Sequence, residues 1–325
     1  MKEPSRTTEV SVADEDASGT SPDLARILKK FAISPADFKT FLEKPYDEVF
    51  TAIRAAAAGR PSYPFMAQRH HTRPKLEAMV SDVATEEQIA ARRIAANRIM
   101  SLYLMHGFTL MPEQEFKRRL SISGLDHLQE AVRDKRGVIL LNSHFGPGRL
   151  IPVILARMGW DLAHVSPIVE QTMLKLSLPG KVSHIALGKN FNLRVLAEIR
   201  TRLLAGEIVH STGDGMNGNA TAEYRFLGKS RPFTMSFGHL ALSTGAACLP
   251  VFVRSDELGA VRLEICPPLD LGAKNTPTPD RIAKMIDHYV DLLEQHWLAD
   301  FGNVPTHSLG LFDRDYTRGS ATGTS

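Results

Sequence analysis

The chain has 325 residues, of which 43% are hydrophobic and 23% are charged. This is the composition of an ordinary globular protein, long enough for one large domain with an appendage or for two modest domains. The formal net charge of +3 gives no reason to expect a protein that binds nucleic acid through its overall charge. No apolar run approaches the roughly 20 residues that a membrane-spanning helix needs, so any contact with a membrane is expected to be peripheral.

Both ends of the chain are predicted to be disordered. Residues 1–22 are polar and rich in Ser, Thr, Asp and Glu, and residues 313–325 are similarly polar. The N-terminal stretch lacks the apolar core of a secretory signal peptide. The two cysteines, Cys248 and Cys266, lie in apolar strand-like segments, which favours a cytoplasmic protein with reduced core thiols. The cysteines and histidines do not have the spacing of a zinc site, so no metal is expected.

Residues 23–120 show only helical patterns and are predicted to form a helical appendage. Ser34 and Pro35 are typical of a helix start, and a second long helical pattern spans residues 85–107. A basic connector, residues 59–75, lies between these helices, and its charges suit either an anionic lipid or phosphate, or a solvated surface. The appendage is therefore expected to dock on a membrane or a carrier protein, or to complete the core.

Short strands alternate with helices between residues 121 and 312. The strand patterns lie at residues 138–142, 160–165, 207–212, 248–253 and 261–266. The helical patterns lie at residues 124–135, 149–159, 192–206, 235–245 and 279–297. Strands that are joined by helices make right-handed crossovers within a parallel sheet. The predicted fold is therefore α/β, with a mostly parallel sheet that helices cover on both faces.

The segment VILLNSHFGPGRL, residues 138–150, places a histidine at the end of a buried strand. In open α/β sheets, ligands bind beyond the carboxyl ends of the strands, and this strand carries His144 to that edge. An unperturbed histidine has a pKa near neutrality, so His144 is a candidate general base. Asn142 ends the strand, and Gly146 and Gly148 leave room for a substrate and backbone N–H groups for an oxyanion. The alternative is that His144 merely caps the turn.

A second candidate, Asp214, lies in the segment HSTGDGMNG, residues 210–218. It follows another predicted strand, and the surrounding glycines and asparagines make a flexible turn. A carboxylate in this position can hold a metal, help to bind a phosphate, or be the acidic partner of a base. A plain turn is the alternative, because Asp and Gly are the expected residues there.

The segment YRFLGKSRPF, residues 224–233, mixes cations with apolar residues. Arg225, Lys229 and Arg231 lie among phenylalanine, leucine and proline. An acyl chain on a phosphopantetheine thioester would need both an apolar lining and positive charge. Cations that flank apolar residues are also common at any helix entrance, so the segment has a purely structural interpretation as well.

Taken in order, four blocks of the sequence resemble the bacterial lysophospholipid and lipid A late acyltransferases, in the branch of the lauroyl and myristoyl transferases. The blocks are GLDHLQEAVRDKRGVILLNSHFG, LAEIRTRLLAGEIVHSTGDG, FLGKSRPFTMSFGHLALSTGAACLPVFVR and a closing helix that ends in QHW. They resemble the family's HFG turn with its preceding strand, its strand that ends on an Asp, its FFG block, and its closing Gln and Trp.

The resemblance implies that a fatty acyl group is transferred from acyl carrier protein or coenzyme A to a hydroxyl or amine, with no bound cofactor. The acceptor would be a lysophospholipid, a glycolipid or a specialised metabolite. In the family a histidine deprotonates the acceptor, and an acid five residues later holds the imidazole in its useful tautomer. Here the histidine is His144, the acid's position holds Arg149, and the family's usual N-terminal membrane helix is missing.

Arg149 changes what this motif can do. A guanidinium has donors only, so it cannot accept a hydrogen bond from the Nδ1–H group of His144. The imidazole would then be oriented by a backbone carbonyl, or by Asp214 if the two strand ends lie side by side. The cation would disfavour protonation of the imidazole, and its forked donors suit a phosphate or carboxylate. Arg149 is therefore expected to bind an anionic group of the acceptor or carrier.

The first hypothesis is an acyltransferase, soluble or peripheral on the cytoplasmic face of the membrane, in which His144 is the base and Asp214 orients it. The residues expected to contact substrate are Asn142, Gly146, Gly148, Arg149, Arg225, Lys229 and Arg231. The second hypothesis is a catalytically silent relative that binds lipids or acyl chains, or that partners an active transferase. Hydrolysis of the thioester by water would use the same residues. Serine nucleophile chemistry is disfavoured because the chain lacks a GxSxG elbow.

Overall fold

The computed structural model describes residues 34–57, 107–108, 111–166, 179–187, 193–214, 221–256, 258–273, 275–300 and 303–304. Both predicted disordered ends and the basic connector lie outside these residues. So do the helical pattern before Ser34 and nearly all of the one at residues 85–107. Among the described residues, no helix is both long enough and apolar enough to cross a bilayer.

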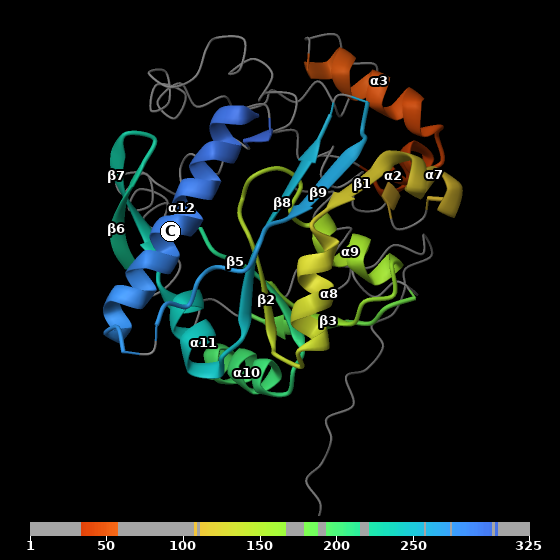
Figure 1. Ribbon diagram of the computed structural model, residues 1–325. Helices are drawn as coiled ribbons and strands as arrows, with labels where there is room; N and C mark the ends of the chain where they lie inside the picture. Colours follow the sequence, from red (N-terminus) through yellow and green to blue (C-terminus); the bar gives the residue numbers. More distant parts are fainter. Residues whose placement is uncertain are drawn as a thin grey trace, which may run out of the picture.

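A seven-stranded sheet forms the centre of the molecule (Figure 1). Its strand order is β1-β9-β8-β2-β5-β3-β4. The strands β8, β2, β5, β3 and β4 are parallel to one another, whereas β9 is antiparallel to β8 and β1 is parallel to β9. The bounds are β1 (Leu120–Ser123), β2 (Val138–Asn142), β3 (Leu162–Ser166), β4 (Val182–Ala186), β5 (Ile208–Thr212), β8 (Ala247–Ser255) and β9 (Val261–Ile265).

Helices cover both faces of this sheet. The helices are α2 (Pro35–Leu42), α3 (Tyr46–Ala57), α7 (Glu113–Arg119), α8 (Leu125–Arg133), α9 (Leu150–Arg157), α10 (Leu193–Leu204), α11 (Ser236–Thr244) and α12 (Thr278–Ala299). One hydrophobic cluster joins α3, α7, α8 and α9 to one face, and a second joins α10, α11 and α12 to the other. Central strands buried on both faces read as continuous apolar runs, which is why VILLN predicts a strand. The predicted α/β fold with a mainly parallel sheet is confirmed.

The described part of the predicted appendage packs against the edge of the sheet where β8 ends. The backbone N–H of Asp37 donates to Ser34 Oγ at 3.0 Å, so Ser34 caps α2 as its sequence position predicts. Pro45 separates α2 from α3, although the apolar pattern suggests a single helix. Val49 and Phe50 of α3 are buried in the same cluster as the sheet. Figure 1 shows α3 close to the turn between β8 and β9, where the Tyr46 hydroxyl donates to Gly259 O at 3.3 Å.

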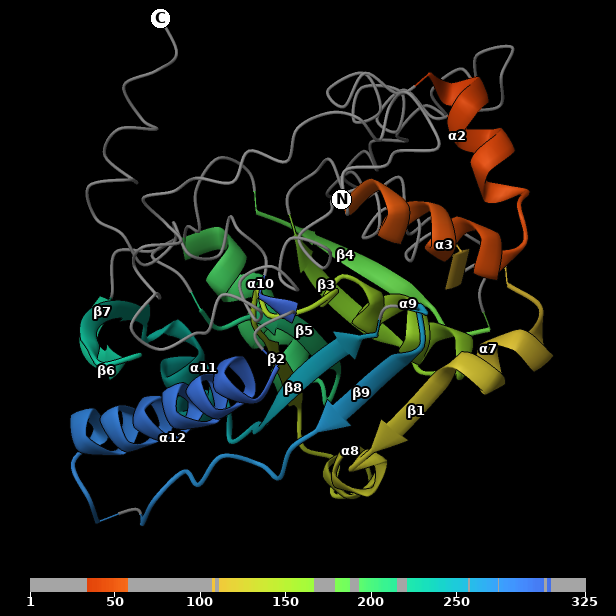
Figure 2. The same cartoon turned by 90° about the horizontal axis from the view of Figure 1, so that it is seen from above.

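Within the described ranges, four strands have no counterpart in the sequence-based prediction: β1, β4, β6 (Thr221–Phe226) and β7 (Lys229–Thr234). The last two form an antiparallel hairpin beside α12 (Figure 2). Its two-residue turn, Leu227 and Gly228, has positive φ angles of 50° and 71°. Hairpin turns of this kind usually carry Asn-Gly or Asp-Gly. The sequence does not indicate this turn, because a bulky residue such as leucine seldom adopts a positive φ.

Candidate active site

His144 and Asp214 meet at the carboxyl edge of the sheet. Their strands, β2 and β5, are parallel neighbours, and Asn142 pairs with Thr212 in the register. Each candidate residue follows its strand by two positions, so the register brings the two side chains together. The side chain of Asp214 is fully buried, whereas that of His144 is 32% exposed. The carboxylate is therefore shielded from solvent, whereas the imidazole is partly accessible.

Three hydrogen bonds join the two residues. Nδ1 of His144 lies 2.9 Å from Oδ1 of Asp214. The backbone N–H of His144 also donates to both carboxylate oxygens, at 3.0 Å and 2.9 Å. An ionised carboxylate only accepts hydrogen bonds, so the neutral imidazole must carry its proton on Nδ1. This tautomer leaves the lone pair on Nε2, which is the arrangement that a general base needs.

The turn after His144 is fixed against the end of β8. The Phe145 N–H donates to Ser143 Oγ at 3.1 Å, and the Gly146 N–H donates to Asn303 O at 2.6 Å. Gly146 has a φ of +61°, and a Cβ atom there would overlap the carbonyl oxygen of Val253. Gly146 is therefore required by close packing, and its N–H is not available to an oxyanion. In the described part of the chain no hydrogen bond engages the Gly148 N–H, which leaves it as a candidate donor.

Asn142 lies beneath this turn and is 6% exposed. Its carbonyl oxygen accepts from the Gly213 N–H at 2.8 Å and from the Tyr289 hydroxyl at 3.0 Å. Its Nδ2 donates to Ser143 O at 3.2 Å, and its Oδ1 has no hydrogen-bond partner among the described residues. Tyr289 is fully buried, and burial together with the charge of Asp214 raises its pKa well above the usual value. Sequence reasoning missed Tyr289, because it continues the apolar stripe of α12.

Arg149 lies at the N-cap of α9 and is exposed. The positive end of the helix dipole makes this an unfavourable place for a cation. Arg149 therefore does not stabilise the helix through its charge. The resemblance implies an acid at this position, and the carboxylate that contacts the imidazole comes instead from Asp214, which follows β5.

The structure separates the three cations of the 224–233 segment. Arg225 and Lys229 are exposed on the β6–β7 hairpin, whereas Arg231 is 3% exposed and its Nε donates to Phe226 O at 3.1 Å. Arg225 pairs with Ser230 in the register, and Tyr224 pairs with Arg231, so Arg225 and Arg231 lie on opposite faces of the hairpin. Arg231 is thus a buried residue that bonds to the hairpin's own backbone, and its sequence context does not distinguish it from Arg225 and Lys229.

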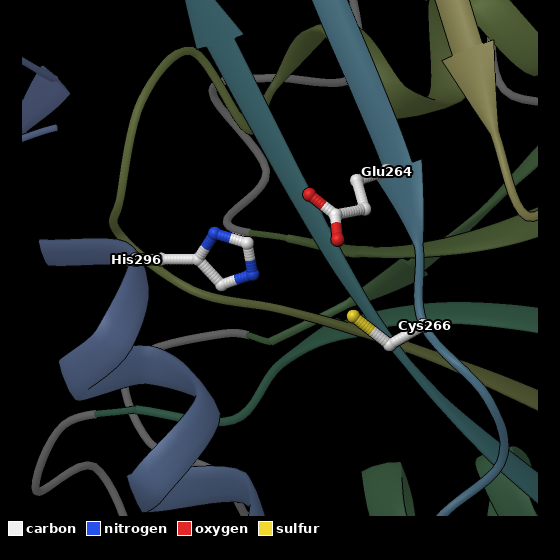
Figure 3. A group of neighbouring side chains, drawn as sticks. All are labelled: Glu264, Cys266 and His296. Atoms are coloured by element: carbon white, nitrogen blue, oxygen red, sulfur yellow. The ribbon is translucent and has the colours of Figure 1, made fainter. Parts of the chain in front are cut away.

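A second polar cluster lies between β9 and the end of α12. Figure 3 shows the side chains of Glu264, Cys266 and His296 facing one another, and their possible ligand atoms lie within 4.8 Å. Arg254 donates to His296 Nδ1 and lies 3.7 Å from Glu264. Burial, and then the charge of Arg254, lower the pKa of His296 to about 4.

The donor set of this cluster does not suit a metal. Because Arg254 occupies Nδ1 of His296, the neutral ring carries its proton on Nε2, where a metal would have to bind. Burial, and secondarily the charge of Glu264, raise the pKa of the Cys266 thiol to about 12, so it is protonated. A guanidinium already supplies the positive charge, and the cluster is better described as the support of Arg254.

Comparison with known proteins gives one family. The model of a family described as bacterial lipid A biosynthesis acyltransferase matches residues 55–298, which is more than half of the chain. The match includes His144, Asp214 and every strand of the sheet. No individual curated protein matches the chain.

Proposed function

Because the chain belongs to the bacterial lipid A biosynthesis acyltransferase family, and is therefore an enzyme that transfers acyl groups, we propose that it acylates a lipid acceptor from a thioester donor with His144 as general base. The observation that carries this proposal is the hydrogen bond of 2.9 Å between His144 Nδ1 and Asp214. It leaves Nε2 basic at an edge of the sheet where the side chain of His144 is accessible.

The proposed reaction begins with the acceptor, a hydroxyl or an amine of a lysophospholipid, glycolipid or specialised metabolite. Nε2 of His144 takes the acceptor's proton as its oxygen or nitrogen forms a bond to the thioester carbonyl carbon. The carbonyl electrons move onto the oxygen, and the Gly148 N–H is the backbone donor nearest in sequence for that charge. When the intermediate collapses, the carbon–sulfur bond breaks and the thiolate leaves. The imidazolium returns its proton to the sulfur.

Asp214 has two roles in this proposal. It holds the imidazole in the tautomer with Nδ1 protonated, and its charge stabilises the imidazolium that forms during the reaction. Arg149 in the place of an acid is the reason to consider a catalytically silent relative. Since Asp214 offers a buried carboxylate to the same nitrogen, we favour the active enzyme.

The donor is proposed to be acyl carrier protein or coenzyme A carrying the acyl group. Arg149, Arg225 and Lys229 are exposed cations, and side chains of this kind suit a phosphate or an acidic carrier protein. No resident cofactor is needed for this reaction, because the thioester is already activated. Nucleic acid has no part in it.

Peripheral contact with the cytoplasmic face of a membrane is also proposed. Three of the large apolar side chains that the described residues expose lie at the carboxyl edge of the sheet. They are Leu193 at the start of α10, Leu258 in the β8–β9 turn and Leu298 near the end of α12. Exposed leucines around a lipid-acylating site suit a shallow contact with acyl chains. Failure of the protein to co-sediment with phospholipid vesicles would count against this contact.

The function is tested by identifying the products. The protein is incubated with acyl carrier protein and coenzyme A thioesters, with and without a lysophospholipid, and the mixture is analysed by mass spectrometry and thiol release. An acylated acceptor supports the proposal. Free fatty acid alone indicates hydrolysis by water, and ligand binding without thiol release indicates the silent relative.

A further inference from the structure

Two arginines lie side by side on the β8–β9 hairpin, next to the turn that carries His144. Arg254 and Arg262 are direct partners in the antiparallel register. Directly opposed residues place their side chains on the same face, with Cβ atoms about 5 Å apart. Arg254 is near the site, because its guanidinium carbon lies 5.9 Å from the centre of the Phe145 ring and Ser255 is bound to Asn303, which holds Gly146.

The charges of this arginine pair are poorly balanced. Arg262 is exposed and forms no ion pair with any residue that the structure describes. The partners of Arg254 are a neutral histidine and Glu264, which is 3.7 Å away and 46% exposed. Like charges directly opposite each other destabilise a sheet. The pair of arginines therefore does not stabilise the fold. An anion bound between the two side chains would remove their repulsion.

His296 keeps Arg254 in place without cancelling its charge. Its side chain is held by ring contacts to Phe145 and Phe252, at centroid distances of 5.9 Å and 3.7 Å. It accepts a hydrogen bond from one nitrogen of the guanidinium only. The remaining donors of Arg254 have no hydrogen-bond partner within the described ranges, and its side chain is 28% exposed. A fixed, partly exposed guanidinium with free donors is suited to bind a phosphate.

We propose that Arg254 and Arg262 form a subsite for a phosphate ester of the substrate. The proposal rests on the acyl transfer proposed above, since that reaction brings a phosphate-bearing molecule to His144. The phosphate belongs either to the phosphopantetheine arm of the donor or to the head group of a lysophospholipid acceptor. Both are phosphate esters, and either would be bound through the same forked donors. The phosphate of a lysophospholipid lies close to its acceptor hydroxyl, whereas that of phosphopantetheine is separated from the thioester by the length of the pantetheine arm.

The test is a binding titration that needs no turnover. Phosphopantetheine is compared with pantetheine, and lysophosphatidic acid with monoacylglycerol, each titrated against the protein and followed by NMR. The subsite predicts that one phosphorylated probe binds about tenfold more tightly than its partner, as expected for one charge-assisted contact of about 1.4 kcal/mol. The pair of probes that shows this preference identifies the source of the phosphate.

Variants then test whether the two arginines cause the preference for the phosphorylated probe. The double variant R254M/R262M is expected to lose this preference, whereas R133M is expected to keep it. Arg133 is an exposed arginine at the end of α8, at the opposite edge of the sheet. If R254M/R262M proves unstable, R262M alone is used, because Arg262 is exposed and unbonded within the described structure; it is expected to weaken the preference.

The proposal is overturned if wild-type protein binds both members of each pair equally, or if the arginine variants keep the preference. A phosphate preference without acyl transfer would refute the proposed function and leave the subsite standing. Acyl transfer without a phosphate preference would refute the subsite and leave the proposed function standing.

Discussion

His144 depends on Asp214 for its orientation, and the Asp214→Asn variant tests this dependence. The amide can donate a hydrogen bond to Nδ1, which would move the imidazole proton to Nε2 and remove the base. By analogy with the serine protease triad, where the same change costs about four orders of magnitude, we expect kcat to fall by about 10²- to 10⁴-fold with little change in KM. Steady-state kinetics measures both constants, and an unchanged kcat would show that Asp214 does not orient the base.

Arg149 is expected to bind an anionic group and to have no part in proton transfer. The Arg149→Met variant should raise KM for an anionic acceptor or carrier by about tenfold and leave kcat within about threefold. Arg149→Glu is the informative companion, because it restores an acid five residues after His144. Since Asp214 already engages Nδ1, the glutamate is expected to give no gain in kcat, and a clear gain would contradict this account.

Some residues of the site are visible in the sequence, and others are not. His144 and Asp214 can be found because each follows an apolar strand and is flanked by glycines. Their contact cannot be found in this way, because it depends on β2 and β5 being neighbours in the sheet. Tyr289 and Arg254 are hidden, since one looks like core and the other like an ordinary strand end. Only the three-dimensional partners of these residues, Asn142 for Tyr289 and His296 for Arg254, give them a role.

The turn between β2 and α9 must pass closely over β8, and Gly146→Ala tests that geometry. The new Cβ would overlap Val253 O and would also oppose a φ of +61°. A displacement of about 1 Å in a catalytic group can cost roughly 100-fold in rate, so we expect a loss of at least that size in kcat. Gly159→Ala is the matched control, because Gly159 has a φ of +89° but no atom within 4 Å of the added Cβ. It should keep its activity.

At the scale of elements, periodicity predicts those with a clear face or a long apolar run. The five helices that the sequence predicts after residue 121 and the central strands are of this kind. The β6–β7 hairpin is missed because Leu227 stands where Asn or Asp would mark the turn. Without the hairpin, the sequence does not distinguish the buried Arg231 from Arg225 and Lys229. β1 has only four residues, and only Ile185 of β4 is buried, so neither strand gives a clear apolar pattern. Their pairing with β9 and β3 defines them, and this information is not local.

The stability of the whole molecule is expected to fall as the pH falls from about 6.5 to about 4. In this range the unfolded chain protonates His296, whose ordinary pKa is 6.5, but the folded protein, in which its pKa is about 4, does not. The unfolded state therefore binds more protons, and the free energy of unfolding decreases by up to about 3 kcal/mol. Burial also lowers the pKa of His210, which adds a change of the same sign.

Denaturant unfolding of wild-type protein and His296→Gln at several pH values measures this effect. Glutamine can still accept a hydrogen bond from Arg254 but does not titrate. The variant should therefore show a weaker decrease in stability between pH 6.5 and pH 4. Equal slopes for the two proteins would exclude His296 as a source of the pH dependence.

The overall architecture follows from the order of strands and helices, and the family match agrees with it. The sequence does not predict how the N-terminal helices pack against the α/β domain. Their sequence allows docking on a membrane, docking on a carrier protein, or completion of the core. Phe50 of α3 is buried in the core cluster, so at least this helix completes the core. It does so beside the β8–β9 turn, at the same edge of the sheet as His144.

The central claim is that His144 acts as the base in acyl transfer. The most direct measurement compares wild-type protein with His144→Ala in single-turnover reactions that follow formation of the acylated lipid, with donor binding measured in parallel. We predict that donor affinity is unchanged within about threefold and that the rate falls by at least about 10³-fold, since removal of a general base has effects of this order. Acyl transfer by His144→Ala at the wild-type rate would contradict the account.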